Sequence, residues 1–243
     1  MQHLLLGLAL VAATASAEPA TVGTTTSDPS VKSVESLAAI QSVPQLGHVA
    51  VDGRIAVLRN LQVELGGWNL FDDTRAGTFL RGGWAGVRWR VWESDGIGIG
   101  LAGRVLVGQR RDANDAVTGA WLQSGSRIRM FSWFHVLPDF EVSVFGPLFQ
   151  ARVANEFRFL LRDFRIGGHG GAQIQVREGV WKVMPLAELS AGWRKHFAPL
   201  DFDVSAGLAL AMDPSALVGH PVFETVQTEL KPWAFLRFAF IPN

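Results

Sequence analysis

Arginine is the side chain in this sequence whose spacing most clearly suggests chemistry. Arg88 and Arg90, and likewise Arg127 and Arg129, are two positions apart, which places both members of a pair on one face of a β-strand. Guanidinium groups gathered on one face bind anions or pair with carboxylates. The arginines that alternation places on such a face are Arg88, Arg90, Arg104, Arg127, Arg129, Arg152, Arg158, Arg162, Arg165, Arg177 and Arg194. Acids on the same face include Glu64, Glu141, Glu156 and Glu188.

Residues that could act in catalysis form no comparable pattern. His135, His169, His196 and His220 could serve as general bases, but the sequence has no G-x-S-x-G motif. No serine and histidine share the spacing of an acyl hydrolase. His169 stands within a run of glycines, which more simply relieve crowding or bend a strand. No H-E-x-x-H motif occurs, so the sequence assigns no catalytic residue, no metal and no cofactor.

The composition limits the classes of function. Lys and Arg together number 22, as do Asp and Glu, so the net charge gives no general attraction to nucleic acid. The 243 residues include no cysteine, which excludes disulfides, thiolate metal sites and a thiol nucleophile. The mean hydropathy of +0.19 is high. However, after the N-terminus no apolar run approaches the roughly 18–20 residues of a membrane helix.

The N-terminal segment has the features of an export signal. An apolar stretch from Leu4 to Ala13 precedes Ala15-Ser16-Ala17, which fits an A-x-A cleavage site. The sequence therefore predicts a signal peptide over residues 1–17 and a periplasmic linker over residues 18–47. Apolar residues between Val31 and Ile40 have nearly helical spacing, so a short amphipathic helix over residues 31–43 is expected. A disordered lead-in to the first strand is the alternative.

From residue 48 to residue 243 the sequence alternates between apolar and polar or small residues. Ile97, Ile99 and Leu101, for example, alternate with Gly98 and Gly100. This period of two predicts an all-β domain, a closed antiparallel up-and-down barrel over residues 48–243.

Turn signals set the expected number of strands. Tight turns are predicted at residues 93–96, 137–139, 163–164 and 198–201, and at 146–149 and 177–179. Longer connections are expected at residues 66–78, 109–119 and 212–220. These give about ten strands when residues 48–65 form one strand. Division of that segment, or pairing of part of residues 20–46, would give twelve, and eight is the other even number considered.

The residue types on the polar face indicate which side of the sheet points outward. That face combines glycine and other small residues with long arginines, which suits a narrow lumen better than a surface in water. Strands of ten or more residues also exceed the usual soluble length of about five or six and fit a tilted membrane crossing. Tryptophans are expected to form interfacial belts at the strand ends: Trp89, Trp92, Trp133, Trp181, Trp193 and Trp233. A soluble, exported, lipocalin-like barrel that binds a ligand is the alternative.

On these patterns, residues 48–243 resemble the small outer-membrane β-barrel proteins of Gram-negative bacteria, which have eight to twelve strands. Such proteins often end in a strand with alternate aromatic residues that the barrel-assembly machinery reads, and Phe238 and Phe240 are similar to that pair. The resemblance implies a location in the bacterial outer membrane. It also implies outer-membrane lipid and the assembly machinery as partners.

The lumen carries the functional expectation. When Lys182, Lys231, Arg237, Asp201, Asp203 and Glu229 are included, the polar face holds about two bases for each acid, which favours small anionic solutes. A narrow anion-tolerant pore is one interpretation. A structural barrel filled by ion pairs is the other, because unpaired charges in the lumen would be costly. An outer-membrane acyl hydrolase that modifies lipid is the enzymatic alternative, although no catalytic motif supports it.

Overall fold

The structure is a computed structural model, and it describes residues 34–43, 46–58, 60–71, 79–111, 115–197, 200–211, 226 and 230–242. The predicted signal peptide, residues 1–17, lies outside these residues, as does the linker up to residue 33. Twelve strands are described. They are β1 (Val34–Val43), β2 (Leu46–Leu58), β3 (Leu61–Phe71), β4 (Phe79–Glu93), β5 (Ile97–Arg110), β6 (Ala116–Phe131), β7 (Phe134–Phe145), β8 (Leu148–Leu161), β9 (Phe164–Arg177), β10 (Val180–Phe197), β11 (Leu200–Ala211) and β12 (Lys231–Pro242).

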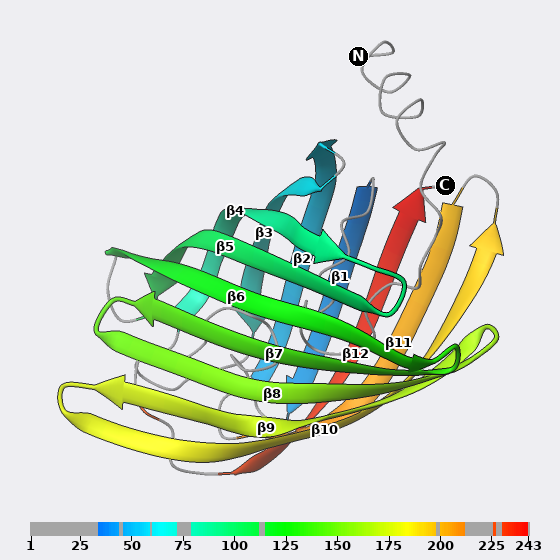
Figure 1. The fold of residues 1–243 in the computed structure, drawn as a ribbon. Coiled ribbons are helices and arrows are strands. Elements are labelled where there is room, and N and C mark those ends of the chain that lie inside the picture. The colour runs from blue at the N-terminus through cyan, green and yellow to red at the C-terminus, as the bar shows by residue number, and fades with distance from the viewer. Residues whose placement is uncertain are drawn as a thin grey trace.

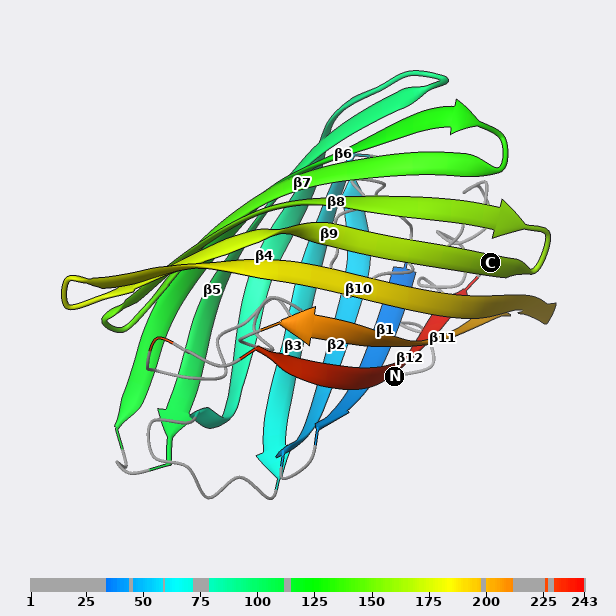
Figure 2. The same ribbon diagram turned by 90° about the horizontal axis from the view of Figure 1, so that it is seen from below.

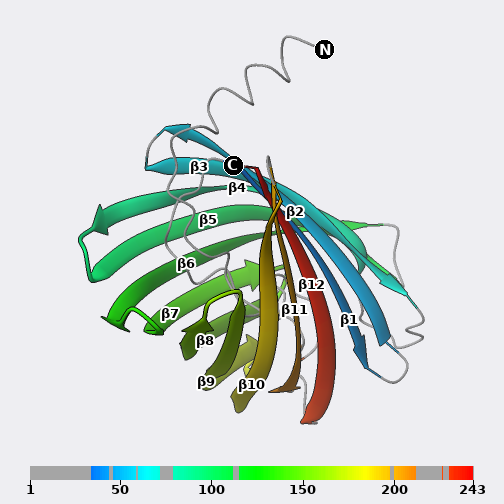
Figure 3. The same ribbon diagram turned by 90° about the vertical axis from the view of Figure 1, so that its right-hand side faces the viewer.

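The strands form a closed barrel in which each strand pairs with its neighbours in the sequence (Figure 1, Figure 2). β1 closes it by pairing antiparallel with both β2 and β12, so that Ala38 lies opposite Val51 on one side and Phe238 on the other. Figure 3 shows β1 and β12 side by side at this closure. Closure satisfies the backbone groups that an open sheet would leave unpaired at its edges. The predicted fold class, a closed antiparallel up-and-down barrel, is confirmed.

The two ends of the barrel differ in their connections. Residues 59–60, 94–96, 132–133, 162–163 and 198–199 join strands at one end, which we call the turn end. The opposite end, the loop end, contains the connections at residues 44–45, 72–78, 111–115, 146–147, 178–179 and 212–230. In outer-membrane barrels the short turns are periplasmic and the longer loops are extracellular. Most of the turns predicted from the sequence are confirmed at these positions.

The described strands number twelve, which is the alternative count, and not ten, because two segments differ from the main prediction. Residues 48–65 divide at residues 59–60 into β2 and β3. Ile55 and Val63 lie opposite each other, and both are odd-numbered, so the alternation passes through the turn without a change of phase. Residues 34–43 form strand β1, so the predicted helix over residues 31–43 and the linker boundary at residue 47 are also wrong. Backbone pairing on both sides of β1 overrides its nearly helical spacing.

The turn predicted at residues 137–139 does not exist. Pro138 and Asp139 lie within β7, and the chain reverses instead at residues 132–133. Pairing of β7 with β6 is interrupted between Asp139 and Val136, whereas pairing with β8 continues through Pro138 opposite Asn155. A proline cannot donate to a ladder, so it is tolerated where the ladder is broken.

The apolar face of the sheet points outward along the barrel. Val87 is 49% exposed, Leu101 43% and Phe159 40%, whereas Arg88 and Arg158 are almost fully buried. A soluble barrel would bury the apolar face and expose the charges. The predicted orientation is therefore confirmed, and the lipocalin-like alternative is wrong in this respect.

Aromatic side chains lie on the outer face near both ends. At the turn end, Trp133 stacks on Phe131, with ring centroids 5.2 Å apart, and on Phe159 at 6.2 Å. At the loop end, Phe71 and Trp181 are exposed. This is the arrangement of interfacial belts around an apolar band. Trp233 is a correction to the predicted belt, because it is buried inside the barrel.

Among the described residues, no helix has the length and apolar character needed to cross a membrane.

A charge placed on the outer face near mid-strand should destabilise the barrel in lipid. Leu122 lies near the middle of β6 and is exposed, so Leu122→Arg should cost about 2–4 kcal/mol of unfolding free energy. Val180→Arg, at the loop end of β10, should cost only about 0–1 kcal/mol. Urea unfolding in phospholipid vesicles measures both, and equal costs would contradict the outward orientation.

Candidate functional site in the barrel lumen

The predicted lumen residues divide into a buried group and a group at the ends of the barrel. Six of the predicted arginines are buried inside: Arg88, Arg104, Arg127, Arg152, Arg158 and Arg165. Arg90, Arg177 and Arg194 are partly buried, and Arg129 and Arg162 are exposed. The four predicted acids are all buried: Glu64, Glu141, Glu156 and Glu188. Arg129 and Arg162 therefore lie outside the buried part of the lumen, at the turn end.

Glu64 on β3 is the centre of a first ion-pair cluster and has no exposed surface. Arg104 from β5 donates to both its carboxylate oxygens, with Nη2 3.0 Å from Oε2. Arg88 from β4 lies 3.6 Å from Glu64 and Arg54 from β2 lies 3.5 Å from it. Arg54 also donates to Asp52, with Nε 2.8 Å from Oδ2. One carboxylate thus connects three guanidinium groups from three other strands.

A second cluster lies across β7, β8, β9 and β10. Arg152 donates through Nη2 to Asp139 at 2.6 Å and to Glu141 at 2.8 Å. His169 lies between two carboxylates, 3.6 Å from Asp139 and 3.8 Å from Glu188. This cluster surrounds His169, the histidine that stands within a run of glycines. Of the glycines around His169, Gly171 fits tight packing, because a Cβ there would lie 2.2 Å from the Val153 carbonyl oxygen, whereas a Cβ on Gly170 would meet nothing within 4 Å.

A third set of ion pairs lies toward the turn end. Arg165 on β9 pairs with Asp203 on β11, and both are buried. Arg194 donates through Nε to Asp201 at 3.0 Å, and His196 Nδ1 lies 2.6 Å from the same carboxylate. These contacts connect β9 and β10 to β11.

Among the residues whose side chains the structure describes, the buried arginines and acids are equal in number. The buried arginines are Arg54, Arg88, Arg104, Arg127, Arg152, Arg158, Arg165 and Arg237. The buried acids are Asp52, Glu64, Asp139, Glu141, Glu156, Glu188, Asp201 and Asp203. The expected excess of about two bases for each acid is therefore wrong for the buried part of the lumen. Several predicted bases lie at the barrel ends, and Asp52 and Asp139 were not assigned to the inner face.

Toward the loop end, the inner face changes from charged to aromatic. Trp68, Trp84, Trp121, Leu106 and Phe145 form a buried cluster. The sequence pattern did not predict this inner aromatic layer, because tryptophan was expected in the outer belts. The available signal was position, because these tryptophans alternate in phase with the glycines and arginines of the inner face.

The aromatic layer fits against glycines and against the ion pairs. A Cβ on Gly82 would lie 2.1 Å from Trp68, and one on Gly66 would lie 2.2 Å from Trp84. Both rings therefore occupy space that only glycine leaves on the neighbouring strand. The Arg104 guanidinium lies 5.2 Å from the Trp84 ring centroid and 4.5 Å from that of Trp121. These cation–π contacts join the aromatic layer to the Glu64 cluster.

The proposed catalytic alternatives gain no support from the arrangement of side chains. The described neighbours of His169 within ion-pairing distance are both carboxylates. Among the residues that the structure describes, no three His, Asp or Glu side chains gather as metal ligands. His220 lies outside the described residues.

The predicted assembly signal is described in part. Phe238 lies on the outward side of β12 and stacks on Phe202, with ring centroids 6.1 Å apart. The side chain of Phe240 lies outside the described residues. Recognition of this pair by the assembly machinery remains a prediction.

Loss of the Glu64 carboxylate should destabilise the barrel strongly. Glu64→Gln removes the charge that three arginines share, and breaking a buried pair costs about 3–5 kcal/mol. Glu93→Gln is the matched control, because Glu93 pairs with Arg90 and Arg127 at the turn end and its side chain is 33% exposed. That change should cost about 0–1 kcal/mol. Urea unfolding in vesicles gives both values, and similar losses would refute the central role of Glu64.

A methyl group between the aromatic rings and the wall should also destabilise the barrel. Gly82→Ala directs a Cβ into the Trp68 ring and toward the Val107 carbonyl oxygen, 2.4 Å away, so a loss of about 1–3 kcal/mol is expected. A Cβ at Gly170 meets nothing within 4 Å, so Gly170→Ala is the control and should be nearly neutral. If Gly82→Ala unfolds at the same urea concentration as the control, the rings do not depend on the glycine.

Comparisons with known proteins show the fold. No protein-family model matches the sequence, and no curated protein matches it. Among solved structures, the NanC porin matches with a TM-score of 0.54 and 5% identity over 86% of this chain and 99% of its own. The KdgM porin matches with a TM-score of 0.52 and 8% identity, over 86% and 99%.

LpxR from Salmonella typhimurium is similar at the same level, with a TM-score of 0.52 and 6% identity over 85% of this chain and 99% of that protein. At such identities the likeness concerns architecture alone. The chain therefore has the fold of outer-membrane β-barrel proteins, as its alternation predicts.

Proposed function

We propose that this chain is an integral outer-membrane protein whose barrel is closed to solutes in the described state and which is not an enzyme. Among the described residues, the balance of eight buried arginines and eight buried acids carries the proposal. Because most of these charges lie beside a charge of opposite sign, the described part of the inner face lacks the excess charge of an anion-selecting passage. The apolar outer face supports the location in lipid.

The fold neighbours agree with this location. NanC and KdgM are named as porins, and the match to this chain covers 99% of the length of each. Their likeness also supports a second candidate, a narrow pore for small anions. The observation in this chain that favours the second candidate is the pair of exposed arginines at the turn end, Arg129 and Arg162, which lie among the exposed acids Glu93, Asp95 and Asp163. Such a pore would need the inner ion pairs to rearrange.

Conductance in planar lipid bilayers separates the two candidates. The refolded protein should give no current above the bare bilayer, because buried ion pairs and the aromatic layer fill its lumen. A triple variant, Glu64→Gly with Arg104→Gly and Trp84→Gly, removes side chains from the first cluster and from the aromatic layer and should conduct, which shows that the assay detects an opened barrel. Heat-modifiable gel migration verifies that both proteins are folded.

Stepwise currents from the wild type, with a reversal potential that indicates anion selectivity, would overturn the closed-barrel proposal in favour of the pore. Sucrose-gradient fractionation tests the location independently of conductance. The protein should sediment with the outer membrane, and recovery in the soluble fraction without detergent would contradict the proposed location.

A further inference from the structure

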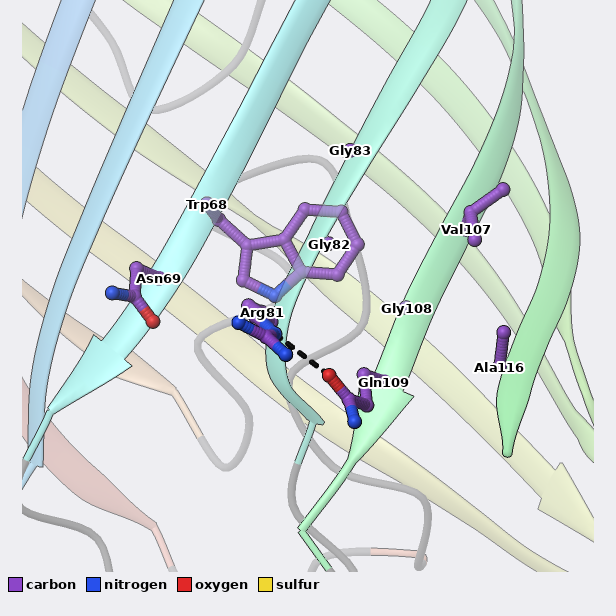
Figure 4. A pocket seen from close by; sticks show the side chains of 9 residues that line it. All are labelled: Trp68, Asn69, Arg81, Gly82, Gly83, Val107, Gly108, Gln109 and Ala116. Carbon is purple, nitrogen blue, oxygen red and sulfur yellow. Dashed lines mark hydrogen bonds between the residues drawn. The ribbon is translucent and has the colours of Figure 1, made fainter. Parts of the chain in front are cut away.

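The outer wall of the barrel has a polar hollow at the loop end, formed by β3, β4, β5 and β6. The pocket has a volume of about 720 Å³, and its lining includes Asn69, Arg81, Gly83, Val107 and Gln109. Figure 4 shows these residues on adjacent strands. By alternation they lie on the outward face, in phase with the exposed residues Leu65 and Val105. The lining also includes Trp68, Gly82 and Gly108, which alternate in phase with the inner face. The hollow shares Trp68 with the aromatic layer but contains no residue of the three ion-pair clusters.

Strand register arranges the outward residues in three rows. Asn69 lies opposite Arg81, and Arg81 lies opposite Gln109, so a polar row crosses three strands two or three residues from the loop end. The next outward row toward mid-barrel contains Gly67 opposite Gly83, followed by Val107.

The third row is wholly apolar, with Leu65 opposite Ala85 and Ala85 opposite Val105. The hollow thus lies where polar side chains meet the apolar band. In an outer-membrane barrel, this is the height of lipid headgroups.

The glycine pair accounts for the hollow. A Cβ on either Gly67 or Gly83 would contact only a carbonyl oxygen of the neighbouring strand, at 3.1 Å, and no side chain. The outer surface is therefore indented directly beneath Arg81. A group that enters this indentation from the bilayer would have the guanidinium on one side and Val107 on the other.

Arg81 is oriented to bind an anion. Its Nε donates to Gln109 Oε1 at 2.7 Å, which fixes the plane of the guanidinium (Figure 4). In the part of the chain that the structure describes, no carboxylate pairs with Arg81, in contrast to the arginines of the three lumen clusters. The two terminal nitrogens of a guanidinium match a phosphate in a bidentate arrangement. The amides of Asn69 and Gln109 supply further donors on either side.

We infer that this hollow binds the phosphate-bearing headgroup of an outer-leaflet lipid. The outward position favours a lipid over a free ion, because the row beneath the guanidinium is apolar and would contact acyl chains. The inference rests on the proposed membrane location, but the following test in detergent does not depend on where the protein is found in the cell.

Native mass spectrometry of the detergent-solubilised, folded chain measures the binding with phosphatidic acid as the probe. Diacylglycerol with the same acyl chains lacks the phosphate, and inorganic phosphate lacks the chains. The wild type should bind phosphatidic acid in preference to both. Arg81→Gln should weaken that binding roughly tenfold or more, since a charge-assisted bidentate contact is lost. Arg81→Lys should bind with intermediate strength, because it keeps the charge but not the fork.

Two further variants separate the hollow from general surface charge. Arg162→Gln removes an exposed arginine at the turn end and should leave binding unchanged. Gly83→Val fills the hollow but keeps Arg81, and should weaken binding, with heat-modifiable migration as the check on folding. The inference is overturned if Arg81→Gln binds as well as the wild type, if Arg162→Gln loses as much, or if inorganic phosphate binds as tightly as the lipid. Failure of fractionation would instead count against the membrane location.

Discussion

The barrel depends on one constraint: a charge that is removed from water must be neutralised by a charge of opposite sign on the inner face. Glu64 shows this constraint most clearly. Its carboxylate is fully buried and lies within ion-pairing distance of guanidinium groups from β2, β4 and β5. An apolar outer face leaves the polar half of every strand to point inward. A barrel of this kind must then fill its interior with water or pair its charges, and the described residues do the latter. Residues far apart in sequence, such as Glu64 and Arg104, are thereby fixed to one another between nearby strands of the wall.

The interior has two layers with different physical bases. Ion pairs lie toward the turn end and the middle, where each broken pair would leave a costly buried charge. Toward the loop end, aromatic rings lie against glycines of the neighbouring strand, so their positions depend on steric fit. Arg104 belongs to both layers, because it pairs with Glu64 and lies over Trp84 and Trp121. Under the closed-barrel proposal, the two layers together close the lumen.

Alternation was sufficient to predict the barrel and its orientation. A strand that has lipid on one side and the lumen on the other needs different residue types on its two faces, so its sequence alternates with a period of two. It could not divide β2 from β3, since the turn at residues 59–60 preserves the phase on both sides. It also could not reveal β1, whose structure follows from pairing with two partners that the local sequence does not specify. The misplaced turn at Pro138 removed Asp139 from the inner face and contributed to the wrong charge balance.

The candidate site was predicted in part. The four predicted acids and six buried arginines follow from alternation, but their partners depend on the register between strands, as with Arg152, Asp139 and Glu141. Whether an arginine is buried in the lumen or lies at an end of the barrel also depends on its position along the strand. Alternation gives no information about that position. The outward hollow at Arg81 depends on three strands in register, so the sequence pattern alone did not indicate it.

The direction of the apolar face is the claim that supports all the others, and spin labelling tests it most directly. The chain contains no cysteine, so single cysteines at consecutive positions across Leu122 and Gln123 of β6 can each carry a nitroxide in the vesicle-embedded protein. Collision rates with oxygen, which concentrates in lipid, should be high at residue 122 and low at residue 123, and should alternate along the strand. The reverse phase, or no alternation, would contradict the account.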